Sequence, residues 1–152
     1  SISQADDDTV TSETALSDWQ PHVVYLSGGN TFWLHHCLDD DWTKRLQSCN
    51  AVYMGQSAGA IVAGQSIETA CWKQWDDPRV VPQMETYDDL EDAQGLGLVG
   101  DYSLFPHMDT EWKGLVKEKR EELDSKLKTI GEEEVYKMAN EKLIVVDNPD
   151  GD

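Results

Sequence analysis

The stretch from residue 51 to residue 64, AVYMGQSAGAIVAG, constrains the fold of this chain more than any other. It begins with an apolar run that is typical of a buried strand and ends with small residues suited to the start of a helix. Between them lies Gly55-Gln56-Ser57-Ala58-Gly59, with glycines where strand and helix must approach closely. Such a turn strains its central serine and exposes the hydroxyl above a helix N-terminus. The stretch therefore predicts a nucleophile elbow at Ser57, with an ordinary strand–helix turn as the alternative.

The first half of the chain alternates between strand and helix patterns. Residues 22–26 and 51–54 are predicted as buried strands, and residues 31–47 and 58–63 as helices. This alternation is the signature of a mostly parallel sheet with helices on both faces, so we expect an α/β fold.

The second half is less regular. Residues 65–96 are predicted as a hairpin or a long loop, and residues 96–105 as one or two short strands that end at Pro106-His107. The spacing of apolar residues predicts one amphipathic helix over 109–130. A closing hairpin is predicted from residues 133–138 and 142–146, around Asn140. The length of 152 residues fits one domain, and we expect a polar N-terminal segment (1–20) followed by a single α/β domain (21–152).

The charge of the chain limits its partners. It carries 30 acidic and 12 basic residues, for a formal net charge of −18. This excludes generic nucleic-acid binding and disfavours anionic membrane surfaces. The three cysteines have no C-x-x-C spacing, which favours a reducing, cytoplasmic location. The chain starts with Ser1 rather than Met, so an upstream segment is a further expectation.

A serine nucleophile needs a base, and the chain holds four histidines. His22 opens a predicted buried strand. His35 and His36 point about 100° apart on a predicted helix, so no metal site is predicted there. His107 follows a strand and a proline, at the strand end where α/β sheets carry their sites. His107 is therefore the predicted base, with an ordinary loop histidine as the alternative.

Two further parts of a serine site follow from this reading. The N–H groups of Gly29, in the turn after the first strand, and of Ala58 would together make an oxyanion hole, although a Gly-Gly turn is also common as a simple turn. An acid must hold the histidine tautomer. Chain order leaves Asp76, Asp77 and Asp109 open for this role.

Three motifs carry a resemblance to a known family. In order, they are Tyr25-Leu-Ser-Gly-Gly-Asn-Thr-Phe32, Gly55-Gln-Ser-Ala-Gly-Ala60, and Gly95-Leu-Gly-Leu98 leading into Phe105-Pro-His107. Over residues 20–146 the chain resembles the peptidase E (aspartyl dipeptidase) and cyanophycinase family of serine peptidases. The resemblance implies a class I glutamine-amidotransferase-like, three-layer α/β sandwich, with serine in place of the usual cysteine. It also implies that the chain lacks the family's first strand and helix.

The resemblance assigns the catalytic roles position by position. Ser57 matches the nucleophile and His107 the base, while Gly29 and Ala58 match the oxyanion donors. Asp76 matches the acid, with Asp77 close behind.

The resemblance also points to substrate contacts. Arg120 lies near the position of an arginine that binds the acidic side chain of the substrate, with a surface arginine as the alternative. Asn30, beside the Gly-Gly turn, is expected to contact the substrate as well.

The leading expectation is a serine peptidase that hydrolyses a peptide bond next to an aspartyl residue through a Ser-His-Asp triad, without metal or organic cofactor. The expected partner is a small peptide, with neither nucleic acid nor membrane, and a homodimer is one option. Three alternatives stay open: a cyanophycinase-like enzyme, whose cationic aspartyl polymer the net charge would attract; another small-peptide or ester hydrolase; and a non-catalytic amidotransferase-like binding domain.

Overall fold

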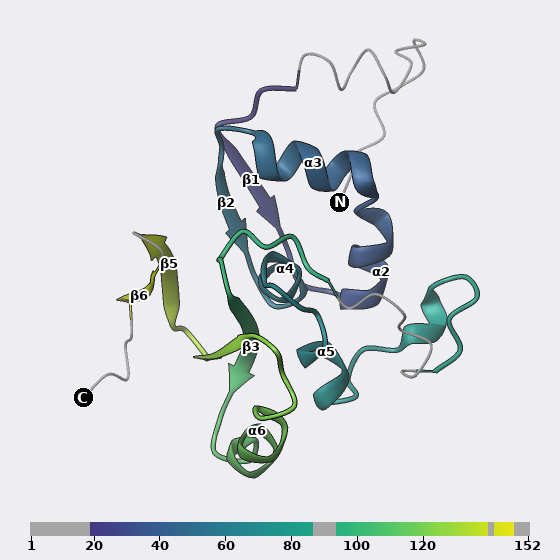
Figure 1. Cartoon of the computed structure of the whole chain (residues 1–152), viewed down its shortest axis with the longest axis vertical. Coiled ribbons are helices and arrows are strands. Elements are labelled where there is room, and N and C mark those ends of the chain that lie inside the picture. The colour runs from purple at the N-terminus through teal and green to yellow at the C-terminus, as the bar shows by residue number, and fades with distance from the viewer. Residues whose placement is uncertain (1–18, 87–93, 140–141, 148–152) are drawn as a thin grey trace.

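The computed structural model describes residues 19–86, 94–139 and 142–147, so most of the predicted N-terminal segment (1–20) lies outside the described residues. Over residues 23–131 at least one helix lies between each strand and the next, and the described chain ends in three consecutive strands (Figure 1). The strands are β1 (Val23–Leu26), β2 (Val52–Gly55), β3 (Tyr102–Met108), β4 (Lys126–Gly131), β5 (Val135–Ala139) and β6 (Lys142–Asp147). The helices are α2 (Thr31–Cys37), α3 (Asp40–Ser48), α4 (Ala58–Ala63), α5 (Thr69–Trp72) and α6 (Lys113–Lys119), with a 3-10 turn η1 (Pro78–Val80).

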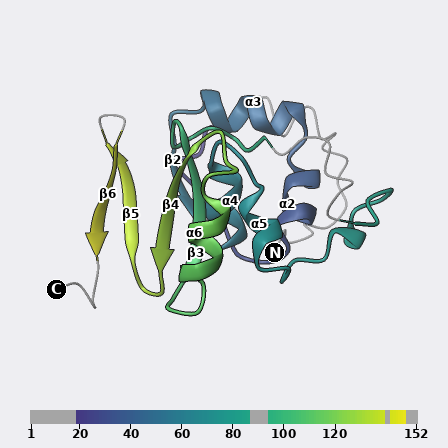
Figure 2. The same ribbon diagram turned by 60° about the horizontal axis from the view of Figure 1, so that its bottom comes forward.

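The described strands form three pairs. β1 and β2 are parallel, with Val23 opposite Val52 and Leu26 opposite Gly55. β3 and β4 are also parallel, and their register shifts between Phe105 and Met108. β5 and β6 form the predicted closing hairpin, which stands at one side of the molecule beyond β4 (Figure 2). Residues 140–141 of its turn lie outside the described residues. The mixed α/β arrangement with parallel strands is the predicted class of fold.

Helix α4 lies at the centre of the packing. All of its residues are buried, and it packs against β1, β2, β3 and α2. It therefore joins the two parallel strand pairs, which share no strand. The core around it consists of Phe32, Leu46, Ile61, Val62, Ile67, Ala70, Val81 and Leu96.

The β1–β2 pair shows the alternation expected of strands. Val24 and Tyr53 pack against the core. Their neighbours on the opposite face are apolar but exposed, with fractions of 52–62 %: Val23, Tyr25, Val52 and Met54. The face with Val24 and Tyr53 is therefore the one that packs against the core, and this packing places the turns that follow β1 and β2.

The helix predicted over residues 31–47 is divided in two. α2 ends at Cys37, and α3 begins at Asp40. Asp39 causes the division because its carboxylate caps α3, accepting a hydrogen bond from Trp42 N at 2.9 Å. Short acidic side chains favour a helix N-terminus over a helix interior, and Asp40 and Asp41 add negative charge in the first turn.

The helix predicted over residues 109–130 is wrong. Only Lys113–Lys119 is helical, and Lys126–Gly131 is strand β4. The apolar residues of β4 happen to continue the helical spacing of those in α6, and this produced the wrong prediction. The segment forms a strand instead because the edge of β3 offers backbone hydrogen bonds to it. The stretch predicted as a hairpin or loop (65–96) holds α5 and η1, and its residues 87–93 lie outside the described residues. Within the described ranges, no helix is both long and apolar enough to span a membrane.

The close approach of α4 to β1 gives a testable expectation for Gly59. An alanine Cβ at this position would lie 2.0 Å from Leu26 O, a backbone atom that accepts a hydrogen bond from Gln56 N at 3.0 Å. Gly59→Ala should therefore lower the free energy of unfolding by about 3 kcal/mol. Urea unfolding followed by circular dichroism measures it. The matched control is Gly114→Ala in α6, where a Cβ meets nothing within 4 Å. That change should leave stability equal or raise it by about 0.5–1 kcal/mol, and equal losses in both variants would contradict the close-approach argument.

Candidate active site

Ser57 lies at the turn between β2 and α4. Its backbone has φ of 53° and ψ of −113°, a conformation that costs a non-glycine residue about 1–3 kcal/mol. The flanking turn holds it there, since Gly59 N donates to Gln56 O at 2.9 Å. The hydroxyl of the half-buried Tyr53 donates to Gly59 O at 2.6 Å, and burial raises the pKa of Tyr53. The elbow geometry expected from the glycine pattern is present, with Ser57 at its tip.

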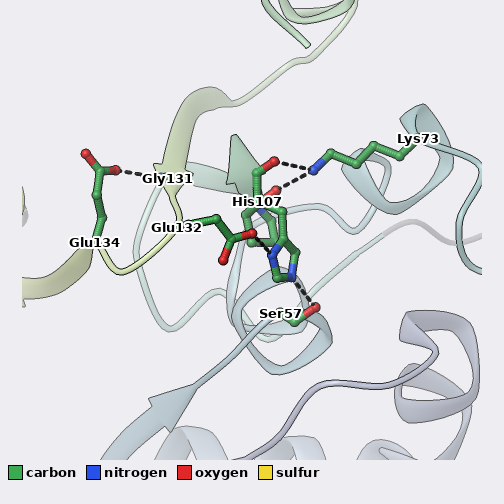
Figure 3. Close-up of polar contacts among 7 residues, drawn as sticks. Ser57, Lys73, His107, Gly131, Glu132 and Glu134 are labelled. Carbon is green, nitrogen blue, oxygen red and sulfur yellow. Dashed lines mark hydrogen bonds and ion pairs between the residues drawn. The ribbon is translucent and has the colours of Figure 1, made fainter. Parts of the chain in front are cut away.

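His107 lies beside Ser57, in the irregular stretch of β3. Its Nε2 is 2.9 Å from Ser57 Oγ, and its Nδ1 is 2.5 Å from Glu132 Oε1 (Figure 3). A carboxylate only accepts hydrogen bonds, so the proton on the imidazole belongs at Nδ1 and faces Glu132. That tautomer leaves Nε2 free to accept the hydrogen bond of the serine hydroxyl. The three side chains thus form a chain in which a carboxylate orients a base and the base contacts a hydroxyl.

Glu132, and not the predicted Asp76, is the carboxylate that contacts His107 in the structure. Both ring nitrogens of His107 are occupied, by Ser57 and by Glu132, so the place expected for Asp76 is taken. Asp76 instead accepts a hydrogen bond from Thr31 N at 3.0 Å.

The two other acids considered also have different partners. Asp77 binds the guanidinium of Arg79, which lowers the pKa of the Asp77 carboxyl. Asp109 accepts a hydrogen bond from Glu111 N at 2.8 Å.

The topology explains why Glu132 meets His107. β3 and β4 are parallel neighbours, so their carboxyl ends lie at the same edge. His107 lies near the end of β3, and Glu132 follows directly after β4. The sequence did contain a signal, because KLKTIG followed by acidic residues reads as a strand with carboxylates at its end. The erroneous helix over 109–130 concealed that signal.

The turn after β1, at Gly28 and Gly29, lies next to the turn that carries Ser57. A Cβ at Gly28 would lie 3.2 Å from Ser57 Cβ and 3.7 Å from Ser57 Oγ. Gly29 has φ of 136°, and a Cβ there would meet nothing within 4 Å, so its backbone is open. Within the described part of the chain, the N–H groups of Gly29 and Ala58 have no hydrogen-bond acceptor. Both therefore remain candidates for the oxyanion donors.

The two predicted substrate contacts have different surroundings. Asn30 caps α2 by accepting from Trp33 N at 3.0 Å, and its amide donates to Asp77 O at 2.9 Å. Both ends of its side chain therefore hold the structure together. Arg120 is exposed at the carboxyl end of α6. A substrate contact by either residue stays a prediction.

A hollow lies at the 74–79 loop, and neither Ser57 nor His107 is among the residues that line it. It has a volume of about 350 Å³ and is lined by residues of the 74–79 loop together with Glu85 and Thr86. Trp75 belongs to its wall, and its ring centroid lies 6.0 Å from that of His107. Because Trp75 is 60 % exposed, it offers an apolar surface to a bound molecule. Among the described residues, no group of three His, Cys, Asp or Glu side chains is arranged to bind a metal ion.

Comparisons with known proteins bear on the family and the fold of this chain. The family model of peptidase family S51 matches residues 6–151. A solved structure from Listeria monocytogenes EGD-e, which bears a provisional peptidase E name, is similar with a TM-score of 0.62 and 22 % sequence identity. The match covers 87 % of this chain and 61 % of that one, so the chain spans about three fifths of its length. No curated protein matches the chain. The structural likeness bears out the predicted α/β fold.

Proposed function

This chain belongs to peptidase family S51, and we propose that it is a serine-type hydrolase that cleaves a peptide bond next to an aspartyl residue. The observation that carries the proposal is the continuous contact from Glu132 through His107 to Ser57. This arrangement activates a hydroxyl at neutral pH, which an isolated serine cannot do. The triad we propose is therefore Ser-His-Glu rather than Ser-His-Asp.

The first half of the reaction forms an acyl-enzyme. Ser57 Oγ attacks the carbonyl carbon of the substrate while His107 Nε2 accepts the hydroxyl proton. The Gly29 and Ala58 N–H groups are the proposed donors to the oxyanion, and the N-terminus of α4 adds its dipole. His107 then gives the proton to the leaving amine.

The second half releases the acid product. Water takes the position of the amine, His107 accepts its proton, and the hydroxide attacks the acyl carbon. Return of the proton to Ser57 Oγ restores the enzyme. Glu132 keeps the proton of Nδ1 in place throughout and stabilises the imidazolium.

The substrate class is the finer part of the proposal. Family membership supports an aspartyl dipeptide, and the exposed ring of Trp75, 6.0 Å from that of His107, offers an apolar contact to a small peptide. The net charge of −18 favours a cationic aspartyl polymer instead, because it repels acidic peptides at long range. Cys37, Cys49 and Cys71 form no disulfide within the described part of the chain, which supports a reducing compartment such as the cytoplasm.

A fluorophosphonate probe tests the nucleophile directly. We expect one covalent adduct on the wild-type protein, located on Ser57 by peptide mass spectrometry. Aspartyl dipeptides should slow the labelling by competition, whereas protection by arginine-bearing aspartyl peptides alone would favour the cyanophycinase-like alternative. An absence of labelling in a folded sample would leave the non-catalytic binding domain as the better reading.

A further inference from the structure

Lys73 contacts the backbone of the strand end that carries His107. It follows α5 directly, and its Nζ donates hydrogen bonds to Pro106 O at 2.8 Å and to His107 O at 2.7 Å (Figure 3). Lys73 and Glu132 therefore hold the same residue at different atoms, one by the main chain and the other by the ring.

The carbonyl groups that Lys73 binds lie where the β3–β4 ladder is irregular. The register shifts between Phe105 and Met108, so Pro106 and His107 have no paired residue in β4. His107 also has φ of 55°, a left-handed conformation that is uncommon for a residue other than glycine. A buried or half-buried carbonyl needs a donor, and Lys73 supplies one to both groups.

Aromatic rings fix the position of the Lys73 ammonium. Nζ lies 4.3 Å from the ring centroid of Trp75, 4.5 Å from that of Phe105 and 5.1 Å from that of Trp112. Cation–π attraction favours such placement. Burial lowers the pKa of Lys73, while the charges of Asp109, Glu132 and Glu111 act in the opposite direction. The side chain is thus packed and directed, unlike an ordinary surface lysine.

We propose that Lys73 is a positioning residue for the general base: it holds the irregular backbone at 106–107 in the conformation that directs the His107 ring to Ser57 and Glu132. It touches none of the reacting atoms, so it acts through His107 alone. The expected effect of Lys73 on the rate of reaction rests on the proposed function. Its effect on the orientation of the His107 ring does not depend on that function.

The experiment compares Lys73→Met, Lys73→Arg and a control, Lys117→Met, at an exposed lysine of α6. We expect Lys73→Met to slow fluorophosphonate labelling of Ser57 roughly 10²-fold, because a displacement of about 1 Å in a catalytic group has that effect. Lys73→Arg retains a cation with several donors and should recover most of the rate. Lys117→Met should label at the wild-type rate. Wild-type labelling by Lys73→Met would overturn the proposal, as would a folded Lys73→Arg variant that is equally slow.

A second readout separates positioning from a general structural role. In uniformly ¹⁵N-labelled protein, the Nδ1 proton shared with Glu132 should give a distinct imidazole signal for His107. Lys73→Met should lose or shift this signal while the remaining amide spectrum is unchanged, and Lys73→Arg should restore it. An unchanged His107 signal in Lys73→Met would overturn the proposal. If the wild type does not react with the probe, the proposed function fails, and this spectrum still decides the role of Lys73. If Lys73→Met does not fold, the Lys73→Arg spectrum decides it, and loss of the signal there is the contrary result.

Discussion

Replacement of Ser57 by alanine is expected to abolish labelling by the fluorophosphonate probe and to lower peptide hydrolysis roughly 10⁶-fold. The reason is that the substitution removes the hydroxyl whose Oγ lies 2.9 Å from His107 Nε2, and no other group on α4 replaces it. The fold should tolerate the change because the strained backbone, rather than the hydroxyl, defines the turn. Labelling is measured by fluorescence in a gel, and hydrolysis by the release of free amine.

Ser27→Ala is the matched control for this loss. Ser27 is exposed in the turn beside Gly28, and its hydroxyl has only a 3.4 Å contact with Gly28 O. We expect its labelling to equal that of the wild type. Persistent labelling of Ser57→Ala at another residue would mean that the nucleophile lies elsewhere.

The second large effect concerns the acid. Glu132→Gln should lower the labelling rate and kcat roughly 10²–10⁴-fold. A glutamine amide can donate a hydrogen bond to Nδ1, which moves the imidazole proton to Nε2 and leaves no acceptor for the Ser57 hydroxyl. The Glu132 side chain is 70 % exposed, so we expect a smaller loss than a buried acid would give. Steady-state kinetics should place the loss in kcat and leave KM nearly unchanged.

Two neutralised acids serve as comparisons for Glu132→Gln. Glu133→Gln removes the charge of an exposed neighbour and should have no effect on kcat. Asp76→Asn tests the acid predicted from the sequence, and since its carboxylate accepts from Thr31 N, we expect a change in stability rather than in kcat. A loss of kcat in Asp76→Asn that exceeds the loss in Glu132→Gln would restore Asp76 to the triad.

The local part of the fold could be predicted from sequence. The elbow depends on residues that are adjacent in the chain, with Gly59 against the backbone of Leu26, so its pattern is visible at short range. The parallel pairing of β1 and β2 follows from the alternation of strands and helices. Strand β4 could not be recognised in the same way. Its identity depends on the open edge of β3, which is a feature of the tertiary structure.

The same distinction explains which parts of the candidate site were found. Ser57 and His107 each carry a local signal, a glycine pattern in one case and a strand end after proline in the other, and the structure brings them together. Glu132 lies 25 residues after His107, and their contact follows only from the pairing of β3 with β4. Lys73 has no sequence signal at all, because its role depends on two carbonyl groups in an irregular strand.

Helix α4 joins two strand pairs that share no strand, and the candidate site lies across that junction. Ser57 belongs to one pair through β2, while His107 and Glu132 belong to the other through β3 and β4. A small sliding of one half against the other would separate Ser57 from His107 without breaking a strand ladder, and proteins open in such partial steps well below global unfolding. The contact between Ser57 and His107 is therefore less stable than the fold itself. A sample can keep a native far-ultraviolet circular dichroism spectrum after this contact, and with it the activity, has been lost.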